Sequence, residues 1–197
     1  ACLGSYMLTV LVIDESRSRA GEICAGLALA GYQVAAILAG SENLTAEVEK
    51  LQPDVILIDT DSPSRDTLEH LATMNKDMPR PVVIFTQEDG QAMIRDAVKA
   101  GVSAYIVDGL DPKRIKPIVE VARARFEDTQ ALRRELDEVS KKLTDRKLVD
   151  KAKGVLMKAR GLDEDAAYHA MRKLAMERGQ SMAKVARDVI DMARVLL

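Results

Sequence analysis

Acidic side chains follow three apolar segments of this chain, at points where strands of a parallel sheet would end. Asp14 and Glu15 follow LTVLVI, Asp59 follows DVILI, and Asp108 follows AYIV, while Thr86 follows PVVIF. Carboxylates gathered at one edge of a sheet can share a divalent cation, and Mg²⁺ prefers oxygen ligands of this kind. The spacing therefore predicts an acidic site that could hold Mg²⁺, although ordinary polar loop residues would give the same spacing.

The first half of the chain alternates between short apolar runs and amphipathic stretches. We expect strands at 8–13, 32–38, 54–58, 81–85 and 104–107, and helices at 18–30, 45–51, 67–74 and 92–100. Fully apolar strands that alternate with helices indicate an α/β fold with a five-stranded parallel sheet covered on both faces. In such sheets the functional crevice lies at the carboxyl ends of the strands, which is where the acidic residues fall.

One long helix is expected to follow, from Lys113 to about Lys158, with Pro117 in its first turn. Within it a seam of residues recurs at alternating spacings of three and four. The seam consists of Ile118, Ala122, Arg125, Thr129, Leu132, Leu136, Val139 and Leu143. Its last four members are the most apolar and predict a parallel coiled-coil homodimer over residues 128–145. A helix folded back on the first half of its own chain is the alternative.

The C-terminal part predicts a compact all-α module of three helices. Helix ends are expected at Arg160, Asp163, Gly179 and Ser181. Residues 1–128 carry 13 basic and 20 acidic residues, and residues 129–197 carry 16 basic and 11 acidic residues. The net charges of −7 and +5 indicate different partners for the two parts, with a polyanion bound by the second. A merely solvated basic surface is the alternative.

The composition excludes several classes of protein. Of the 197 residues, 47% are hydrophobic and 30% are charged, as in ordinary globular proteins. No apolar run approaches the ~20 residues that span a bilayer, and two cysteines make neither a disulfide framework nor a zinc site. We therefore expect a cytoplasmic protein with no membrane partner. Residues 1–6 are expected to be a tag remnant.

Residues 7–127 resemble a response-regulator receiver domain of the flavodoxin-like (CheY-like) fold. The resemblance rests on the acidic pair, on the lone aspartate after DVILI, and on the threonine after PVVIF. It implies a phosphoacceptor at Asp59, Mg²⁺ ligands at Asp14, Glu15, Asp59 and the backbone carbonyl of Asp61, and a switch hydroxyl at Thr86. It requires no cofactor beyond that possible Mg²⁺.

The receiver pattern is broken at the end of the fifth expected strand. Receivers place a lysine there, whose ammonium pairs with the phosphoacceptor, whereas this chain has Asp108. An anion in the place of a cation weakens the stabilisation of an aspartyl phosphate, although Lys113 lies a few residues on. We therefore expect a pseudo-receiver that is regulated by a partner protein more than by phosphorylation of Asp59.

Residues 146–197 resemble the ANTAR module, named after the AmiR and NasR antitermination regulators. The resemblance rests on the stretch AKGVLMKARGLDEDAAYHAMRKLAM. RNA loops offer phosphates to basic side chains and unstacked bases to aromatic ones, and glycine allows close approach of a backbone. The basic face and the resemblance together give as candidate RNA contacts Lys147, Lys151, Lys153, Gly154, Tyr168, Arg172 and Lys173.

A receiver, a coiled coil and an ANTAR module in this order resemble transcription antiterminators of the nitrate-assimilation (NasT) type. The resemblance implies binding to paired stem-loops in a leader mRNA, which prevents termination in genes of nitrate or nitrite assimilation. It also implies a ligand-sensing protein that sequesters the regulator. Rival hypotheses are a phosphorylation-controlled DNA-binding response regulator and a protein-interaction adaptor. An enzyme is not expected, because the chain has no Gly-rich phosphate loop and no Cys/His pairing.

Overall fold

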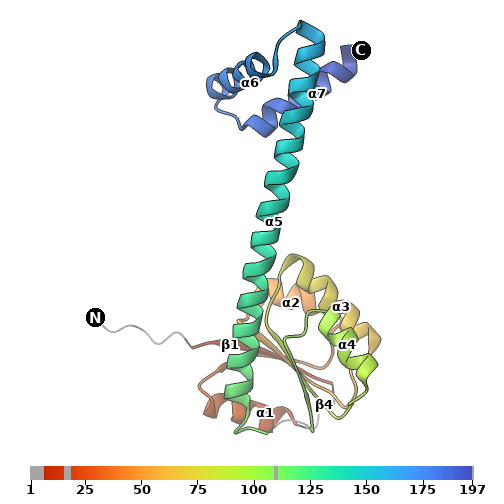
Figure 1. Ribbon diagram of the computed structural model, residues 1–197. Coiled ribbons are helices and arrows are strands. Elements are labelled where there is room, and N and C mark those ends of the chain that lie inside the picture. The colour runs from red at the N-terminus through yellow and green to blue at the C-terminus, as the bar shows by residue number, and fades with distance from the viewer. Residues whose placement is uncertain (1–6, 16–18, 109–110, 197) are drawn as a thin grey trace, which may run out of the picture. The chain divides into compact units, whose positions relative to one another are not determined.

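The computed structural model describes residues 7–15, 19–108 and 111–196 (Figure 1). The expected tag remnant, residues 1–6, lies outside them. The chain divides into two compact units, residues 1–130 and 131–197, and the division falls inside the long helix α5 (Ile115–Arg160). Within the described residues no helix is both long enough and apolar enough to cross a membrane.

The first unit is built on a five-stranded parallel sheet, which confirms the expected α/β fold. Its strands are β1 (Thr9–Asp14), β2 (Gln33–Leu38), β3 (Val55–Asp59), β4 (Val82–Thr86) and β5 (Ala104–Val107), in the order β2-β1-β3-β4-β5. The helices between them are α1 (Ala20–Leu29), α2 (Leu44–Leu51), α3 (Arg65–Asp77) and α4 (Gln91–Lys99). All four strand pairs are parallel.

Three strands extend one residue beyond their apolar runs. Asp14 in β1 lies opposite Asp59 in β3, Asp59 lies opposite Phe85 in β4, and Thr86 lies opposite Val107 in β5. The strand ends differ from the sequence expectation because these polar residues still take part in strand pairing. As a result, the side chains of the predicted acidic site start from a rigid sheet and not from loops.

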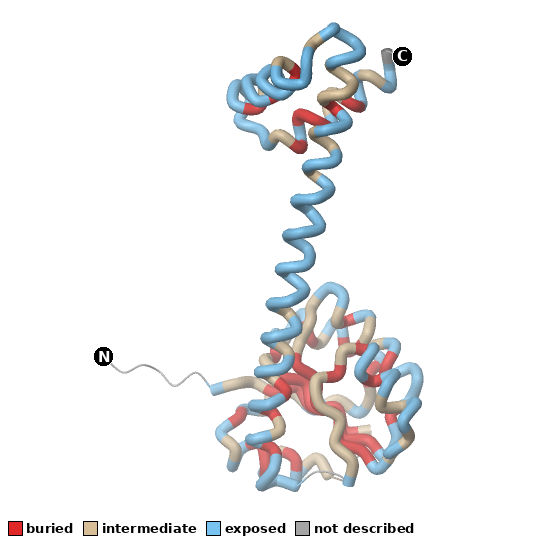
Figure 2. Tube along the Cα trace, in the orientation of Figure 1, coloured by how far each residue is buried: buried red, intermediate tan, exposed pale blue. Residues whose placement is uncertain are grey.

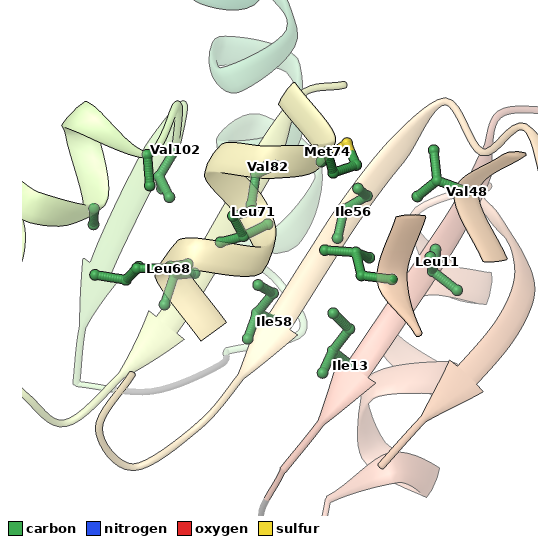
Figure 3. Packing of buried hydrophobic residues seen from close by; sticks show 14 residues of the cluster. Leu11, Ile13, Val48, Ile56, Ile58, Leu68, Leu71, Met74, Val82 and Val102 are labelled. Carbon is green, nitrogen blue, oxygen red and sulfur yellow. The ribbon is translucent and has the colours of Figure 1, made fainter. Parts of the chain in front are cut away.

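Two hydrophobic cores cover the two faces of the sheet. Alternate residues of a strand point to opposite faces, so that Leu11 and Ile13 pack with residues of α2 and α3 (Figure 3), whereas Val10 and Val12 pack with α1 and the start of α5. The buried strands appear as a continuous buried block in the first unit (Figure 2). Burial on both faces explains why the apolar runs of the central strands β1, β3 and β4 are continuous, whereas the edge strands β2 and β5 are only partly buried.

The C-terminal unit contains the end of α5, α6 (Glu164–Arg178) and α7 (Met182–Leu196). The Asp163 side chain caps α6 by accepting a hydrogen bond from the backbone N–H of Ala166, and Gly179 ends α6 with φ 60°. These are the helix boundaries that the sequence predicts. The core of the unit is small and contains Ala152, Met171, Ala175, Val185, Ala186 and Ile190.

Candidate functional site

The acidic site lies at the carboxyl ends of β1 and β3. Asp14 and Asp59 end these neighbouring strands and pair in register, and their exposed fractions are only 2% and 0%. Thr86 ends β4 and is also buried. The structure therefore brings together three of the residues that the sequence points to, at the edge where α/β sheets place their functional crevice.

The cation beside Asp59 is Arg19, to which the sequence pattern gave no role. Its Nε lies 3.3 Å from Oδ2 of Asp59, and its Nη2 lies 3.8 Å from Oδ1 of Asp61. Within the described residues neither carboxylate oxygen of Asp59 accepts a hydrogen bond. Burial raises the pKa of Asp59, the guanidinium of Arg19 opposes that rise, and the nearby carboxylate of Asp14 adds to it.

Glu15, the second member of the acidic pair, is turned toward α3. The hydroxyl of Thr67 donates to its Oε1 at 2.8 Å. Thr67 is buried in the first turn of α3, where its backbone N–H bonds to the capping Oγ of Ser64. The carboxylate of Glu15 is thus held by the N-terminus of α3, a position that favours negative charge.

The switch candidate Thr86 is fixed by hydrogen bonds on two sides. Its hydroxyl donates to the carbonyl oxygen of Asp61 at 2.9 Å and accepts from the backbone N–H of Glu88 at 3.1 Å. The hydroxyl of Tyr105, in β5, donates to the carbonyl of Glu88 at 2.9 Å. Tyr105 therefore holds the same loop from the neighbouring strand. Its place inside an apolar run, AYIV, gave no sign of this role.

Asp108 follows β5 directly and is exposed, with a φ of 76° in the left-handed region. Lys113 is exposed as well, and its backbone N–H donates to the side chain of Asp111. Among the described residues, the positive charge that faces Asp59 therefore comes from Arg19 and not from Lys113. In the described part of the chain, no three His, Cys, Asp or Glu side chains are arranged to hold a metal ion.

The basic surface of the C-terminal unit combines exposed residues of α5 and α6. The exposed candidates are Lys147, Lys151, Tyr168, Arg172 and Lys173. Tyr168 is 40% exposed, and its ring lies edge-on to that of His169, with 6.1 Å between the ring centroids. The surface thus offers cations for phosphates and an aromatic ring on which a base can stack.

Lys153 differs from the other basic candidates because it pairs with carboxylates of two helices, whereas Lys173 pairs only with Glu177 of its own helix. Its Nζ lies 2.9 Å from Oδ1 of Asp150 and 2.7 Å from Oε1 of Glu164, and its side chain is only 15% exposed. These two carboxylates raise the pKa of the Lys153 ammonium, with the hydrogen bond to Asp150 as the largest cause. Lys153 therefore joins α5 to the first turn of α6, and its charge is neutralised within the unit.

Gly154, beside it in α5, is half-buried, and a Cβ added there would meet no atom within 4 Å. No packing contact inside the unit therefore requires a glycine at this position. A glycine inside a helix costs roughly 1 kcal/mol relative to alanine. The structure leaves open space at Gly154 in which a partner's backbone or phosphate could come close.

The predicted seam divides into a buried part and an exposed part. Ala122 is fully buried and packs with the sheet of the first unit, with Ile118 against the same core. The four apolar members farther on are strongly exposed in the single chain: Leu132 67%, Leu136 68%, Val139 57% and Leu143 54%. The N-terminal part of the expected seam thus belongs to the core of the first unit, and the remaining seam starts at Leu132.

Comparison with known proteins assigns both units to families. Residues 10–120 match the response regulator receiver domain, and residues 137–190 match the ANTAR domain. A receiver domain protein (CheY-like) from Methanospirillum hungatei shares the fold of the first unit, with a TM-score of 0.54 at 20% identity; the match covers 62% of this chain and 98% of that chain.

Two curated regulators are similar in sequence. The transcriptional regulatory protein PdtaR of Mycobacterium tuberculosis is 27% identical over 182 residues, which are 92% of this chain and 89% of that protein. The nitrate regulatory protein of Klebsiella oxytoca is 36% identical over 75 residues, which are 38% of this chain and 19% of that protein. These relatives are transcriptional regulators and not enzymes. The chain therefore belongs to the response regulators, with a receiver domain followed by an ANTAR domain.

Proposed function

We propose that this response regulator is a transcription antiterminator, whose ANTAR domain binds paired stem-loops in a leader mRNA and prevents termination. The observation that carries the proposal is the exposed basic and aromatic surface of the C-terminal unit. Lys151 and Arg172 are exposed there, and no acidic partner lies within ion-pair distance of either one among the described residues. Unpaired cations of this kind bind RNA phosphates, and the ring of Tyr168 supplies a surface on which an RNA base can stack.

Genes of nitrate or nitrite assimilation are the proposed targets. The support is the similarity to the nitrate regulatory protein of Klebsiella oxytoca. That similarity spans 75 residues, so the proposed target genes rest on a shorter match than the assignment of the chain to its family. Since a leader transcript is bound while it is being made, we place the regulator in the cytoplasm.

A dimer suits paired stem-loops. The exposed seam from Leu132 to Leu143 gives α5 an apolar stripe that a second copy of the chain would cover. Two ANTAR domains on one coiled coil would bind two adjacent loops with an effective concentration that raises the overall affinity by roughly 10²–10⁴ over a single loop. We therefore propose a parallel homodimer as the form that binds RNA.

The direct test is RNA binding by the purified protein across a salt series. An RNA with two adjacent stem-loops should bind tightly, and the affinity should fall as salt rises, because Lys and Arg release counterions from phosphates. Lys151→Ala and Arg172→Ala should each weaken binding. Each should also reduce the slope of log affinity against log salt by about 1, as expected for the loss of one phosphate contact. Arg187→Ala, which removes an exposed cation from α7, is the matched control and should bind like the wild type.

Two outcomes would contradict the RNA assignment. One is binding to duplex DNA of the same length that equals or exceeds binding to the two-loop RNA, which would favour a DNA-binding response regulator. The other is equal binding by Arg172→Ala and Arg187→Ala, which would show that the α6 surface does not contact the RNA.

Regulation is proposed to come from a ligand-sensing protein that sequesters the regulator. Two observations support this. Asp108 stands where receivers have a lysine, and the candidate phosphoacceptor Asp59 pairs with Arg19. Under this proposal acetyl phosphate should change the affinity for the two-loop RNA by less than about twofold, because no phosphoryl transfer is needed. A tenfold or larger increase that Asp59→Asn abolishes would favour control by phosphorylation instead.

A further inference from the structure

The acidic site of the receiver contains its own cation. One guanidinium, that of Arg19, lies 3.3 Å from Asp59 and 3.8 Å from Asp61 and thus spans two carboxylates. Asp59 is completely buried, whereas the side chain of Arg19 is 29% exposed. The guanidinium that pairs with the buried carboxylate is therefore itself partly in contact with solvent.

Two other oxygens that could ligate a metal accept hydrogen bonds within the protein. Oε1 of Glu15 accepts the hydroxyl proton of Thr67 at 2.8 Å. The carbonyl oxygen of Asp61 accepts from the hydroxyl of Thr86 at 2.9 Å and from the backbone N–H of Gln87 at 3.2 Å. A carbonyl oxygen has two lone pairs, so these two donors use both of them. The carbonyl oxygen of Asp61 can therefore bind a metal only if it gives up a hydrogen bond, and the carboxylate of Glu15 has one acceptor site in use.

As long as Arg19 pairs with Asp59, this site does not fit a resident Mg²⁺. That ion requires near-octahedral oxygen ligands at about 2.0–2.1 Å and loses its water reluctantly. Here the guanidinium of Arg19 faces Asp59 with a fixed positive charge, which opposes such an ion by repulsion, and the carbonyl oxygen of Asp61 has no lone pair left for it. The absence of a suitable group of three ligands among the described residues agrees with this conclusion.

We propose that Arg19 closes the acidic site, so that this receiver holds a built-in guanidinium in the place where a divalent cation would bind. The guanidinium of Arg19 offsets the charges of Asp59 and Asp61 without a metal ion. This inference concerns only the first unit and does not depend on RNA binding by the second. It makes Arg19 a positioning residue whose removal should open the site to a divalent ion.

The experiment is a titration with Mn²⁺, an ion with the same preference for oxygen ligands, followed by the electron paramagnetic resonance signal of the free ion. Full-length wild type, Arg19→Ala and Lys113→Ala are compared. We expect Arg19→Ala to bind one Mn²⁺ at least tenfold more tightly than the wild type, and Mg²⁺ to displace it. Lys113→Ala removes an exposed cation that does not face Asp59, so it should behave like the wild type.

Further variants assign the binding to the site. Asp59→Asn combined with Arg19→Ala should lose the gained Mn²⁺, because the buried carboxylate is its ligand. Arg19→Gln keeps hydrogen-bonding capacity without charge and serves if Arg19→Ala does not fold. The proposal is overturned if the wild type binds Mn²⁺ within threefold of the folded Arg19 variant, or if the gained ion persists without Asp59. RNA binding is not measured, so neither result bears on the antiterminator proposal.

Discussion

Lys153 in α5 and Glu164 in the first turn of α6 form an ion pair, with 2.7 Å between Nζ and Oε1. The same ammonium lies 2.9 Å from Oδ1 of Asp150, one turn before it in α5. A small three-helix unit has few apolar residues to bury, so a tie between two of its helices matters more than an exposed pair in a large domain would. The pair therefore gives Lys153 a role in stability that its neighbours in the basic surface do not share.

Lys153→Ala should lower the thermal stability of the C-terminal unit by a few degrees, because it removes the ion pair between α5 and the first turn of α6. Lys151→Ala removes a basic residue from the same helix but breaks no ion pair that the structure contains. We expect Lys151→Ala to melt like the wild type and yet to bind RNA less tightly. Melting followed by circular dichroism checks the first effect. Equal melting temperatures of Lys153→Ala and Lys151→Ala would contradict the view that Lys153 stabilises the contact between α5 and α6.

The stabilisation by Lys153 should depend on pH at both extremes. The pKa of Lys153 is raised above 10.5 by its carboxylate partners, so this contribution is complete below 10.5 and is lost as pH rises through the folded-state pKa. The pKa of Asp150 is lowered below 3.8, chiefly by the hydrogen bond from Lys153, so its contribution is complete above 3.8 and is lost at more acid pH. Urea unfolding of the wild type and Lys153→Gln from pH 3 to 11 should give a difference that is constant between about pH 5 and 9. A difference that changes within that window would exclude this account.

Asp59→Asn is expected to stabilise the receiver at pH 7. Burial raises the pKa of Asp59, which means that the ionised carboxylate is disfavoured in the folded state relative to the unfolded one. The amide removes that cost, and the gain should shrink as pH falls through the folded-state pKa, where the carboxyl group becomes neutral as well. Asp61→Asn, at a side chain that is 79% exposed, is the control. Chemical unfolding at pH 7 and pH 4 measures both, and a loss of stability in Asp59→Asn at pH 7 would show that the ion pair with Arg19 outweighs the burial.

The elements of the fold were predictable because they depend on local pattern. Five apolar runs gave the five strands, and residues such as Asp163 and Gly179 marked helix ends through their own side-chain or backbone preferences. The acidic edge followed from topology, since strand ends of a parallel sheet meet at one side.

The partners within the sites were not predictable in the same way. Arg19 lies forty residues before Asp59, and nothing in the spacing says that its guanidinium reaches that carboxylate. In the sequence, Lys153 cannot be distinguished from the other residues of the basic surface. Only the structure shows that its ammonium contacts Glu164 in the first turn of α6. The seam of α5 shows the same limit, because heptad spacing does not reveal that Ala122 is covered by the sheet of its own chain whereas Leu136 is exposed.

Leu136→Lys should convert a dimer into a monomer. Leu136 is 68% exposed in the single chain and lies in the middle of the apolar stripe, so a lysine there would place a charge in the proposed coiled-coil interface. Glu138→Lys introduces the same residue two positions on, which is the opposite face of the helix, and should leave the dimer intact. Sedimentation equilibrium decides between them. A wild type that is monomeric, or a Leu136→Lys variant that remains dimeric, would rule out the coiled coil.

Gly154→Ala should separate stability from RNA binding. The added Cβ meets no atom within 4 Å, so the substitution brings no steric cost inside the unit and should stabilise α5 by roughly 0.5–1 kcal/mol through the better helix propensity of alanine. If RNA approaches the helix at this glycine, the same methyl group should weaken binding to the two-loop RNA. Thermal melting and RNA titration of the same protein sample give the change in stability and the change in affinity for the two-loop RNA. Gly21→Ala in α1, where an added Cβ also meets nothing within 4 Å, is the matched control and should change only stability. Because most substitutions that weaken binding also destabilise the fold, a variant that is more stable and binds RNA less tightly would identify Gly154 as a contact. Unchanged binding would remove Gly154 from the proposed surface.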